Sequence, residues 1–288
     1  MAAQRRLHTA TVLTDGSVLI AGGRNDTNPI HACGPSQNCV ILGSAEIDNP
    51  LTKGFSGTGS LNNNRAGHTA TRLNDGTVLV TGGSNVDSSG VEYALSTAET
   101  YSPISASFTS TSNPMNTARY AHTATLLNNG KVLIAGGIDS NNSYLKTAEL
   151  YDPATRTFTP ITPGMNAARA RHTATLVPNG TVLLSGGFVV LPNGTLDTNT
   201  AGTAEIYDPV QNSFGSLISY PTGIELAGLP NWSTLLENGT VLLTDGNSTV
   251  LYDPGTQQFT LSGVLITSRF NYSANLLDDG AVLFAGGN

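Results

Sequence analysis

Four histidines of this 288-residue chain recur at one position of a repeated sequence, and by type they could bind a metal or move a proton. Two further copies of the repeat carry Asn and Tyr there, so that the full set is His8, His68, His122, His172, Asn231 and Tyr272. A zinc ion needs ligands at about 2 Å, whereas packed β-sheets lie about 10 Å apart. If each copy forms its own sheet, equivalent side chains are too far apart to share one ion. We therefore expect these imidazoles to satisfy backbone groups of their own structural units.

Arginine occupies a second recurring position, three residues before the histidine position. The set is Arg5, Arg65, Arg119, Arg169 and Arg269, with Gly228 in the remaining copy. Five of the chain's 13 basic residues are thus locked to the repeat, and converging guanidinium groups could bind a carboxylate or sulfate by bidentate pairing. In the alternative, each arginine pairs with a neighbouring acidic or carbonyl group and ties structural units together.

Two further sets of polar residues could bind a ligand or a metal: carboxylates at a repeated position, and Asn and Asp residues in the loops. The repeated acids are Glu46, Glu99, Glu149 and Glu205, and we interpret them as hydrogen-bonded repeat positions rather than as a catalytic pair. The loops hold Asn25, Asp26, Asn85, Asp87, Asp139, Asn141 and Asn142. Such oxygens can bind Ca²⁺, but they lack the ordered spacing of a calcium loop, and turn chemistry explains them better. We predict no catalytic residue, metal site or cofactor.

The two cysteines, Cys33 and Cys39, lie in the longest loop expected between strands. A disulfide that closes this loop is the favoured interpretation, and it predicts an oxidising, extracellular or cell-surface location with any leader outside these residues. The alternative is a metal site with His31, which has no fourth ligand nearby in the sequence.

The sequence segment that positions these residues occurs six times, and each copy is expected to form a strand, a turn and a second strand. The copies read LHTATVLTDGSVLIAGG, GHTATRLNDGTVLVTGG, AHTATLLNNGKVLIAGG, RHTATLVPNGTVLLSGG, PNWSTLLENGTVLLTDG and NYSANLLDDGAVLFAGG, and their turn glycines are 41 to 60 residues apart. Asp-Gly and Asn-Gly favour a tight two-residue hairpin. Third strands follow at AEIDNP, AETYSP, AELYDP, AEIYDP and VLYDP, and fourth strands at Phe55, Phe108, Phe158, Phe214 and Phe259. Four short strands in each period near 50 residues predict a radial β-array.

This pattern resembles the kelch repeat over essentially the whole chain. The matching diglycines are Gly22-Gly23, Gly82-Gly83, Gly136-Gly137, Gly186-Gly187 and Gly286-Gly287, and the matching tyrosines are Tyr101, Tyr151, Tyr207 and Tyr252. The five phenylalanines stand where kelch repeats usually have tryptophan. The chain departs from the pattern at Asp245-Gly246, where one glycine of the diglycine is lost, and at Asp48, which replaces the tyrosine in the first unit. The resemblance implies an all-β, kelch-type β-propeller.

Counting strands gives five full four-stranded blades plus a two-stranded half blade, which fit a complete ring of six or seven. We predict a single domain over residues 1–288, with blades at about 5–64, 65–118, 119–168, 169–227 and 228–268 and the half blade at 269–288. An open sheet edge invites pairing with another strand. Either further strands of a longer protein complete the last blade, or a partner or another copy does so by strand addition.

The loops between second and third strands lie on the same side of each blade as the connection into the next blade. They vary in length, from about 21 residues after Gly23 to almost none after Gly246, and variable loops on a rigid scaffold are the usual seat of recognition. The recurring arginines begin on this same face, and we predict a ligand site there.

Composition excludes some functions. A net charge of −7 with only 11% charged residues argues against a nucleic-acid surface, and no apolar run approaches the roughly 20 residues that span a bilayer. Our leading hypothesis is a secreted or surface scaffold, not an enzyme, that binds a protein, glycan or small anionic ligand through its long-loop face. The alternatives are the propeller part of a galactose oxidase-like copper oxidase, with copper not expected from this chain alone, and a structural extracellular subunit assembled through the half blade.

Overall fold

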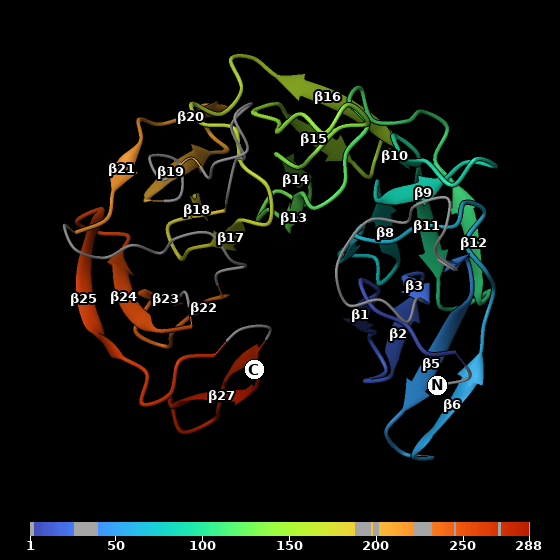
Figure 1. The fold of residues 1–288 in the computed structure, drawn as a ribbon, viewed down its shortest axis with the longest axis horizontal. Helices are drawn as coiled ribbons and strands as arrows, with labels where there is room; N and C mark the ends of the chain where they lie inside the picture. The colour runs from blue at the N-terminus through green and yellow to red at the C-terminus, as the bar shows by residue number, and fades with distance from the viewer. Residues whose placement is uncertain are drawn as a thin grey trace. The chain divides into compact units, whose positions relative to one another are not determined.

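The computed structural model describes residues 3–25, 40–187, 197, 202–221, 232–244, 246–269 and 272–287. Every regular element within them is a β-strand (Figure 1), which confirms the all-β prediction. None of these residues forms a helix long and apolar enough to cross a membrane. The chain divides into two compact units: unit 1 holds Met1–Ser143 and Glu149–Pro160, and unit 2 holds Tyr144–Ala148 and Ile161–Asn288. A single domain over residues 1–288 stays a prediction.

Unit 1 contains three four-stranded antiparallel sheets. The first is β1 (Thr9–Val12), β2 (Val18–Ala21), β5 (Ala45–Asn49) and β6 (Gly54–Gly57). The second is β7 (Thr69–Arg72), β8 (Val78–Thr81), β11 (Ala98–Ser102) and β12 (Ser107–Ser110). The third is β13 (Thr123–Leu126), β14 (Val132–Ala135), β15 (Ala148–Asp152) and β16 (Thr157–Ile161), of which Ala148 and Ile161 fall in unit 2. These sheets are blades 1, 2 and 3.

Unit 2 contains two further complete blades and the half blade. Blade 4 is β17 (Thr173–Leu176), β18 (Val182–Ser185), β19 (Thr203–Asp208) and β20 (Ser213–Phe214), with β21 (Ile218–Ser219) also paired to β19. Blade 5 is β22 (Trp232–Leu235), β23 (Val241–Thr244), β24 (Ser248–Asp253) and β25 (Gln258–Val264). The half blade is β26 (Tyr272–Leu276) and β27 (Val282–Gly286). The predicted four strands per blade are therefore confirmed, except that blade 4 has the additional short strand β21.

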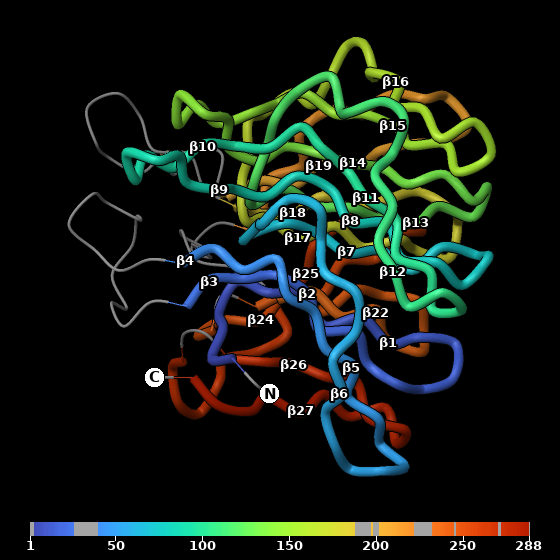
Figure 2. The backbone as a smooth tube through the Cα atoms, turned by 90° about the vertical axis from the view of Figure 1, so that its right-hand side faces the viewer, coloured from blue at the N-terminus to red at the C-terminus, as the bar shows by residue number. Residues whose placement is uncertain are grey.

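Two small hairpins extend the loops between second and third strands. Blade 1 carries β3 (Arg24–Asn25) paired with β4 (Val40–Ile41), and blade 2 carries β9 (Ser84–Val86) paired with β10 (Glu92–Ala94). Figure 2 shows both hairpins at one end of their blades. The sequence did not predict them as strands.

The second strand of blade 2 is buried on both faces because blades 1 and 3 cover it. In β8, the side chains of Val78, Leu79 and Val80 are at most 1% exposed, so the alternation of a half-buried strand is lost. Tyr101 of the third strand packs on Phe108 of the fourth, with ring centroids 4.8 Å apart. Full burial of one such side chain stabilises the fold by about 1.5–3 kcal/mol.

The turns between first and second strands contain three residues, and the predicted two-residue hairpin is wrong. In blade 1, the N–H of Gly16 donates to the carbonyl of Leu13 at 3.1 Å, and the N–H of Leu13 donates to the carbonyl of Ser17 at 2.8 Å. This is a turn closed by a glycine bulge, with Gly16 at φ +81°. The side chain of Asp15 accepts the N–H of Ser17 at 2.9 Å, and this bond favours the longer loop over the two-residue form.

First strands of consecutive blades contact each other inside each unit: β1 with β7 and β7 with β13 in unit 1, β17 with β22 and β22 with β26 in unit 2. Just before these strands, the N–H of Gly67 donates to the carbonyl of Leu7 at 2.9 Å, and the N–H of Ala121 to the carbonyl of Gly67 at 3.0 Å. All three residues have φ between 53° and 61°. Backbone hydrogen bonds therefore join the three blades of unit 1.

Candidate functional site

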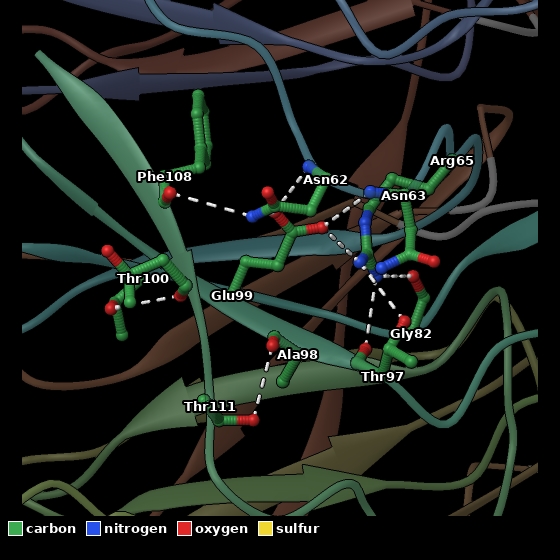
Figure 3. Close-up of polar contacts among 11 residues, drawn as sticks. Asn62, Asn63, Arg65, Gly82, Thr97, Ala98, Glu99, Thr100, Phe108 and Thr111 are labelled. Atoms are coloured by element: carbon green, nitrogen blue, oxygen red, sulfur yellow. Dashed lines mark hydrogen bonds and ion pairs between the residues drawn. The ribbon is translucent and has the colours of Figure 1, made fainter.

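The recurring arginine and the recurring glutamate meet inside their own blade, and we call this arrangement the clamp. In blade 2, Arg65 Nη2 donates to Glu99 Oε1 at 2.6 Å, and Nη1 donates to the carbonyls of Gly82 at 2.6 Å and Thr97 at 3.0 Å (Figure 3). Both charged side chains are 0% exposed. Burial lowers the pKa of Arg65, and the nearby Glu99 opposes this shift. A buried charge of this kind requires its partner.

The same glutamate also holds the linker that arrives from the preceding blade. Glu99 Oε2 accepts the backbone N–H of Asn62 at 2.7 Å and its side-chain amide at 2.8 Å, while Oε1 accepts the N–H of Asn63 at 3.0 Å. Asn116 contacts Glu149 in the same way in blade 3. In blades 2 and 3, the clamp therefore attaches the segment that enters the blade to the third strand of that blade.

Three further blades repeat the clamp. The ion pairs are Arg5–Glu46 at 2.7 Å, Arg119–Glu149 at 3.0 Å and Arg169–Glu205 at 3.0 Å. In each, Nη1 donates to the carbonyl of the first diglycine residue, with partners Gly22, Gly136 and Gly186. Four of the five arginines predicted to bind a ligand are thus paired within their blades. The geometry supports the alternative interpretation, pairing with acidic and carbonyl groups, and a ligand role for these side chains stays a prediction.

The fifth arginine lies in the half blade and makes only part of the clamp. Arg269 Nη1 donates to the carbonyl of Gly286 at 3.1 Å and approaches that of Phe284 at 3.5 Å. Its Nε is buried without a hydrogen-bond partner in the described residues, as it also is in the complete clamps of Arg5 and Arg65. No carboxylate of the described chain forms an ion pair with this guanidinium.

Two of the recurring histidines hydrogen-bond to threonine hydroxyls of the preceding blade. His68 Nε2 lies 3.0 Å from Thr9 Oγ1 of blade 1, and His122 Nε2 lies 2.9 Å from Thr69 Oγ1 of blade 2. The rings reach the first strand of the preceding blade, where a hydroxyl side chain faces them. Burial lowers the pKa of His68 and of His172 to about 3. The imidazoles of His68 and His172 are therefore neutral at physiological pH.

The acidic loop residues organise turns. Asp87 Oδ1 accepts the backbone N–H groups of Ser89 at 2.8 Å and Val91 at 2.9 Å. Asp139 Oδ1 likewise accepts those of Asn141 and Ser143, both at 2.8 Å. The turn interpretation of these residues is supported, since one oxygen of each carboxylate is already used by the backbone.

The long loops of blades 2 and 3 meet. The N–H of Ala94 at the end of β10 donates to Ser140 Oγ at 3.0 Å, so the β9–β10 hairpin and residues 139–143 form one surface, which we call the unit 1 loop surface. Val91 and Tyr93 on it are 57% and 37% exposed. It is one described part of the predicted long-loop face, which also includes the β3–β4 hairpin of blade 1.

Other predicted site residues fall outside the described residues. Cys33, Cys39 and His31 lie in 26–39, and most of the long loop of blade 4 lies in 188–201. In the described part of the chain, no group of three His, Cys, Asp or Glu side chains is placed to hold a metal ion.

Comparison with known proteins agrees with this geometry. The Kelch motif matches residues 119–165, which cover blade 3. A search of curated proteins finds no match. Among solved structures, that of YjhT is 14% identical, with a TM-score of 0.69, and the alignment covers 98% of this chain and 90% of that one. The repeat of four-stranded blades, the diglycine turns and these two matches together show that this chain carries the kelch motif and has the fold of a kelch-type β-propeller.

Proposed function

We propose that this chain is an interaction scaffold that binds a protein partner through the unit 1 loop surface, outside the cell or at its surface. The observation that carries the proposal is the joining of two loops from different blades into one surface with exposed Val91 and Tyr93. Exposed aromatic and aliphatic side chains within a polar rim are typical anchors of protein interfaces. Kelch propellers commonly mediate such interactions. The extracellular setting rests on the disulfide expected between Cys33 and Cys39.

Hydrogen bonds hold the loops of this surface in one conformation, which favours binding with little ordering cost. Asp87 and Asp139 fix the two turns through their backbone hydrogen bonds. The hydroxyl of Tyr120, which precedes β13, donates to the side-chain oxygen of Asn142 at 3.3 Å. The polar loop residues are thereby held in place around the exposed side chains.

A photoreactive residue placed at Tyr93 tests the proposal. We expect it to crosslink a protein from the native source that is not captured from a matched position at Ile104. Ile104 is 100% exposed in the same blade, but it lies in the turn between third and fourth strands, at the opposite end of the sheet. The captured protein is identified by mass spectrometry and purified for binding measurements.

Binding of the purified partner then decides the matter. We expect the substitutions Val91→Asp and Tyr93→Ala together to weaken its affinity by at least about tenfold, because loss of interface anchors costs more than about 1.4 kcal/mol. Equal crosslinking from both positions, or an unchanged affinity, would show that the unit 1 loop surface is not the binding site.

A further inference from the structure

An open pocket lies between blades 4 and 5, at the end of the sheets that holds the turns between first and second strands. Its volume is about 430 Å³, and it is lined by residues 178–179 of blade 4 and by residues 237–240 and 253–255 of blade 5. All of these residues belong to unit 2. The volume falls within the range of about 300–1,000 Å³ that is typical of small-ligand sites. We call this site the turn pocket.

The lining of the turn pocket is acidic on one side and apolar on the other. None of its nine residues is basic, and two of them, Glu237 and Asp253, carry carboxylates. In the described part of the chain, neither carboxylate forms an ion pair. Pro178 and Pro254 supply apolar surface. Such a lining suits a ligand that has a cationic end and an alkyl or ring body.

The turns around the pocket already use some of its polar atoms. Asp253 Oδ1 accepts the N–H of Gly255 at 2.8 Å, and Asn238 Oδ1 accepts the N–H and the hydroxyl of Thr240 at 3.0 and 2.7 Å. No hydrogen bond within the described residues uses Asp253 Oδ2, the carboxylate of Glu237 or Asn238 Nδ2. Two carboxylates and one amide donor therefore remain for a ligand.

Blade 3 shows what the equivalent aspartate binds. Lys131 follows the turn glycine of that blade, and its Nζ lies 3.1 Å from Asp152 Oδ2. This hydrogen bond lowers the pKa of Asp152. The same two positions in blade 5 are Thr240 and Asp253, which are the next opposite pair beyond the register of β23 with β24. An ammonium group thus lies on the aspartate of blade 3, and the equivalent position of blade 5 supplies none.

Blade 5 also has a second carboxylate that blade 3 lacks. Glu237 takes the position of Asn128, two residues before the turn glycine. From blade 3 to blade 5, one positive charge is lost at the position of Lys131 and one negative charge is gained at that of Asn128. The side chain of Thr240 is also shorter than that of Lys131. The sequence of blade 5 therefore makes this place both more acidic and less filled by the chain itself.

We propose that the turn pocket binds the primary ammonium group of a ligand, with Asp253 in the role that Asp152 has toward Lys131 and with Glu237 as a second partner. An ammonium group has three N–H donors, so both carboxylates can accept from it at once. Asn238 Nδ2 is left to donate to a hydroxyl or carbonyl oxygen of the same ligand. The ammonium group comes either from a lysine side chain or from a free amino sugar.

Two pairs of small molecules, each with a charged and a neutral member, test the proposal by NMR titration of the whole chain. Acetyl-lysine methylamide, acetylated on its α-amino group, is compared with its norleucine counterpart, and glucosamine with N-acetylglucosamine. In at least one pair we expect the charged member to bind at least about tenfold more tightly, because charge-assisted hydrogen bonds are roughly twice as strong as neutral ones. The pair that shows the difference identifies the source of the ammonium group. The amide signals of Gly239, Thr240 and Gly255 should shift, and that of Gly76 in blade 2 should not.

Three variants locate the site. Asp253→Asn keeps the turn, since Asn49 makes the same turn bond at 2.9 Å in blade 1, and it should weaken binding of the charged member by about tenfold. Thr240→Lys, which copies Lys131, should abolish binding because the chain's own ammonium group then takes the place of the ligand's. The matched control Asp208→Asn removes the same charge from the equivalent position of blade 4 and should leave binding unchanged.

Equal affinity of the two members in both pairs would overturn the proposal, and so would unchanged affinity in Thr240→Lys or an equal loss in Asp208→Asn. If another part of the protein already fills the turn pocket, neither charged molecule binds, and that result overturns the proposal as well. The comparison within a pair uses the unaltered protein, so it decides even if a variant fails to fold. None of these results depends on the unit 1 loop surface.

Discussion

At the scale of the residue, the clamp shows how a charge is kept inside a β-sheet protein. The guanidinium of Arg65 is fully buried, and its Nη atoms reach two carbonyls and one carboxylate. The carboxylate of Glu99 in turn accepts the N–H groups of Asn62 and Asn63. Apart from Arg65 Nε, which is buried without a hydrogen-bond partner, each group satisfies the next, and removing one member leaves a further buried polar atom unpaired.

We expect Glu99→Val, which copies Val250 of blade 5, to destabilise the protein by about 3–5 kcal/mol. The reason is that Arg65 would remain buried without its carboxylate. The double substitution Arg65→Met with Glu99→Val should cost less than Glu99→Val alone, because no uncompensated charge is left. Urea unfolding of the three variants measures both differences. A double variant that is less stable than Glu99→Val would contradict this account of the pair.

The sequence predicted the positions of the arginines and glutamates but not their pairing. Arg65 and Glu99 are 34 residues apart, and only the return of the third strand beside the second brings them together. Two signals were present: blade 5 lacks both residues, and an asparagine recurs three residues before the arginine. That asparagine is Asn62, Asn116 and Asn166. Neither signal has a meaning until the strand register is known.

At the scale of the element, the diglycine turns bring the backbones of successive blades into close contact. A Cβ on Gly82 would lie 2.3 Å from the carbonyl oxygen of Arg119, which begins the next blade. Gly67 also has a positive φ, +61°, but a Cβ there would meet nothing closer than 4.0 Å. Its equivalents in blades 1 and 3 are Leu7 and Ala121.

We expect Gly82→Ala to destabilise the protein by more than about 2 kcal/mol, since the left-handed conformation alone costs roughly 1–2 kcal/mol and the clash adds to it. The matched control Gly67→Ala should change the free energy of unfolding by no more than about 1 kcal/mol, because reduced freedom of the unfolded chain offsets the backbone cost. Thermal or urea unfolding compares the two. Equal effects would mean that backbone conformation, and not the contact between blades, decides the need for glycine.

The strands themselves follow from the sequence, but some connections do not. Alternation in the first strands and aliphatic runs such as Val78–Thr81 predict the sheets, because burial dictates both patterns. The turn length was wrong, since Asp15 stabilises a three-residue loop through its own side chain. The β9–β10 hairpin escaped prediction because it is short, polar and specified by Asp87 rather than by a hydrophobic period.

At the scale of the whole molecule, charge is divided between an interior of matched pairs and an acidic exterior. Four arginines and four glutamates cancel each other inside the blades. The net charge of −7 is therefore borne by the remaining residues, which agrees with a partner other than nucleic acid.

Buried neutral histidines make the stability of the whole protein depend on pH. His68 and His172 bind a proton near pH 3 in the folded state and near pH 6.5 in the unfolded chain. Unfolding takes up protons between these values, so stability is full above about pH 6.5 and falls as the pH drops toward 3. Each histidine contributes a slope of up to about 1.4 kcal/mol per pH unit.

We expect urea unfolding at about pH 7, 6 and 5 to show this decline. The variant His172→Asn, which copies Asn231 of blade 5, should show a shallower slope, with one titrating group fewer. Carboxylates with lowered pKa, such as that of Asp152, affect stability only at lower pH. A slope that is the same in the variant would show that His172 does not titrate on unfolding.

The order of residues along the clamp has a consequence for synthesis on the ribosome. In each of the four blades that have a clamp, the arginine emerges well before its glutamate, by 34 residues in blade 2. At translation rates of about 5–20 residues per second, that interval is roughly 2–7 s. Throughout it, the newest of these blades has a cation whose anion has not yet been made and a second strand with one free side. In these four blades the open strand edge is therefore exposed to pairing with other chains until the third strand has been made.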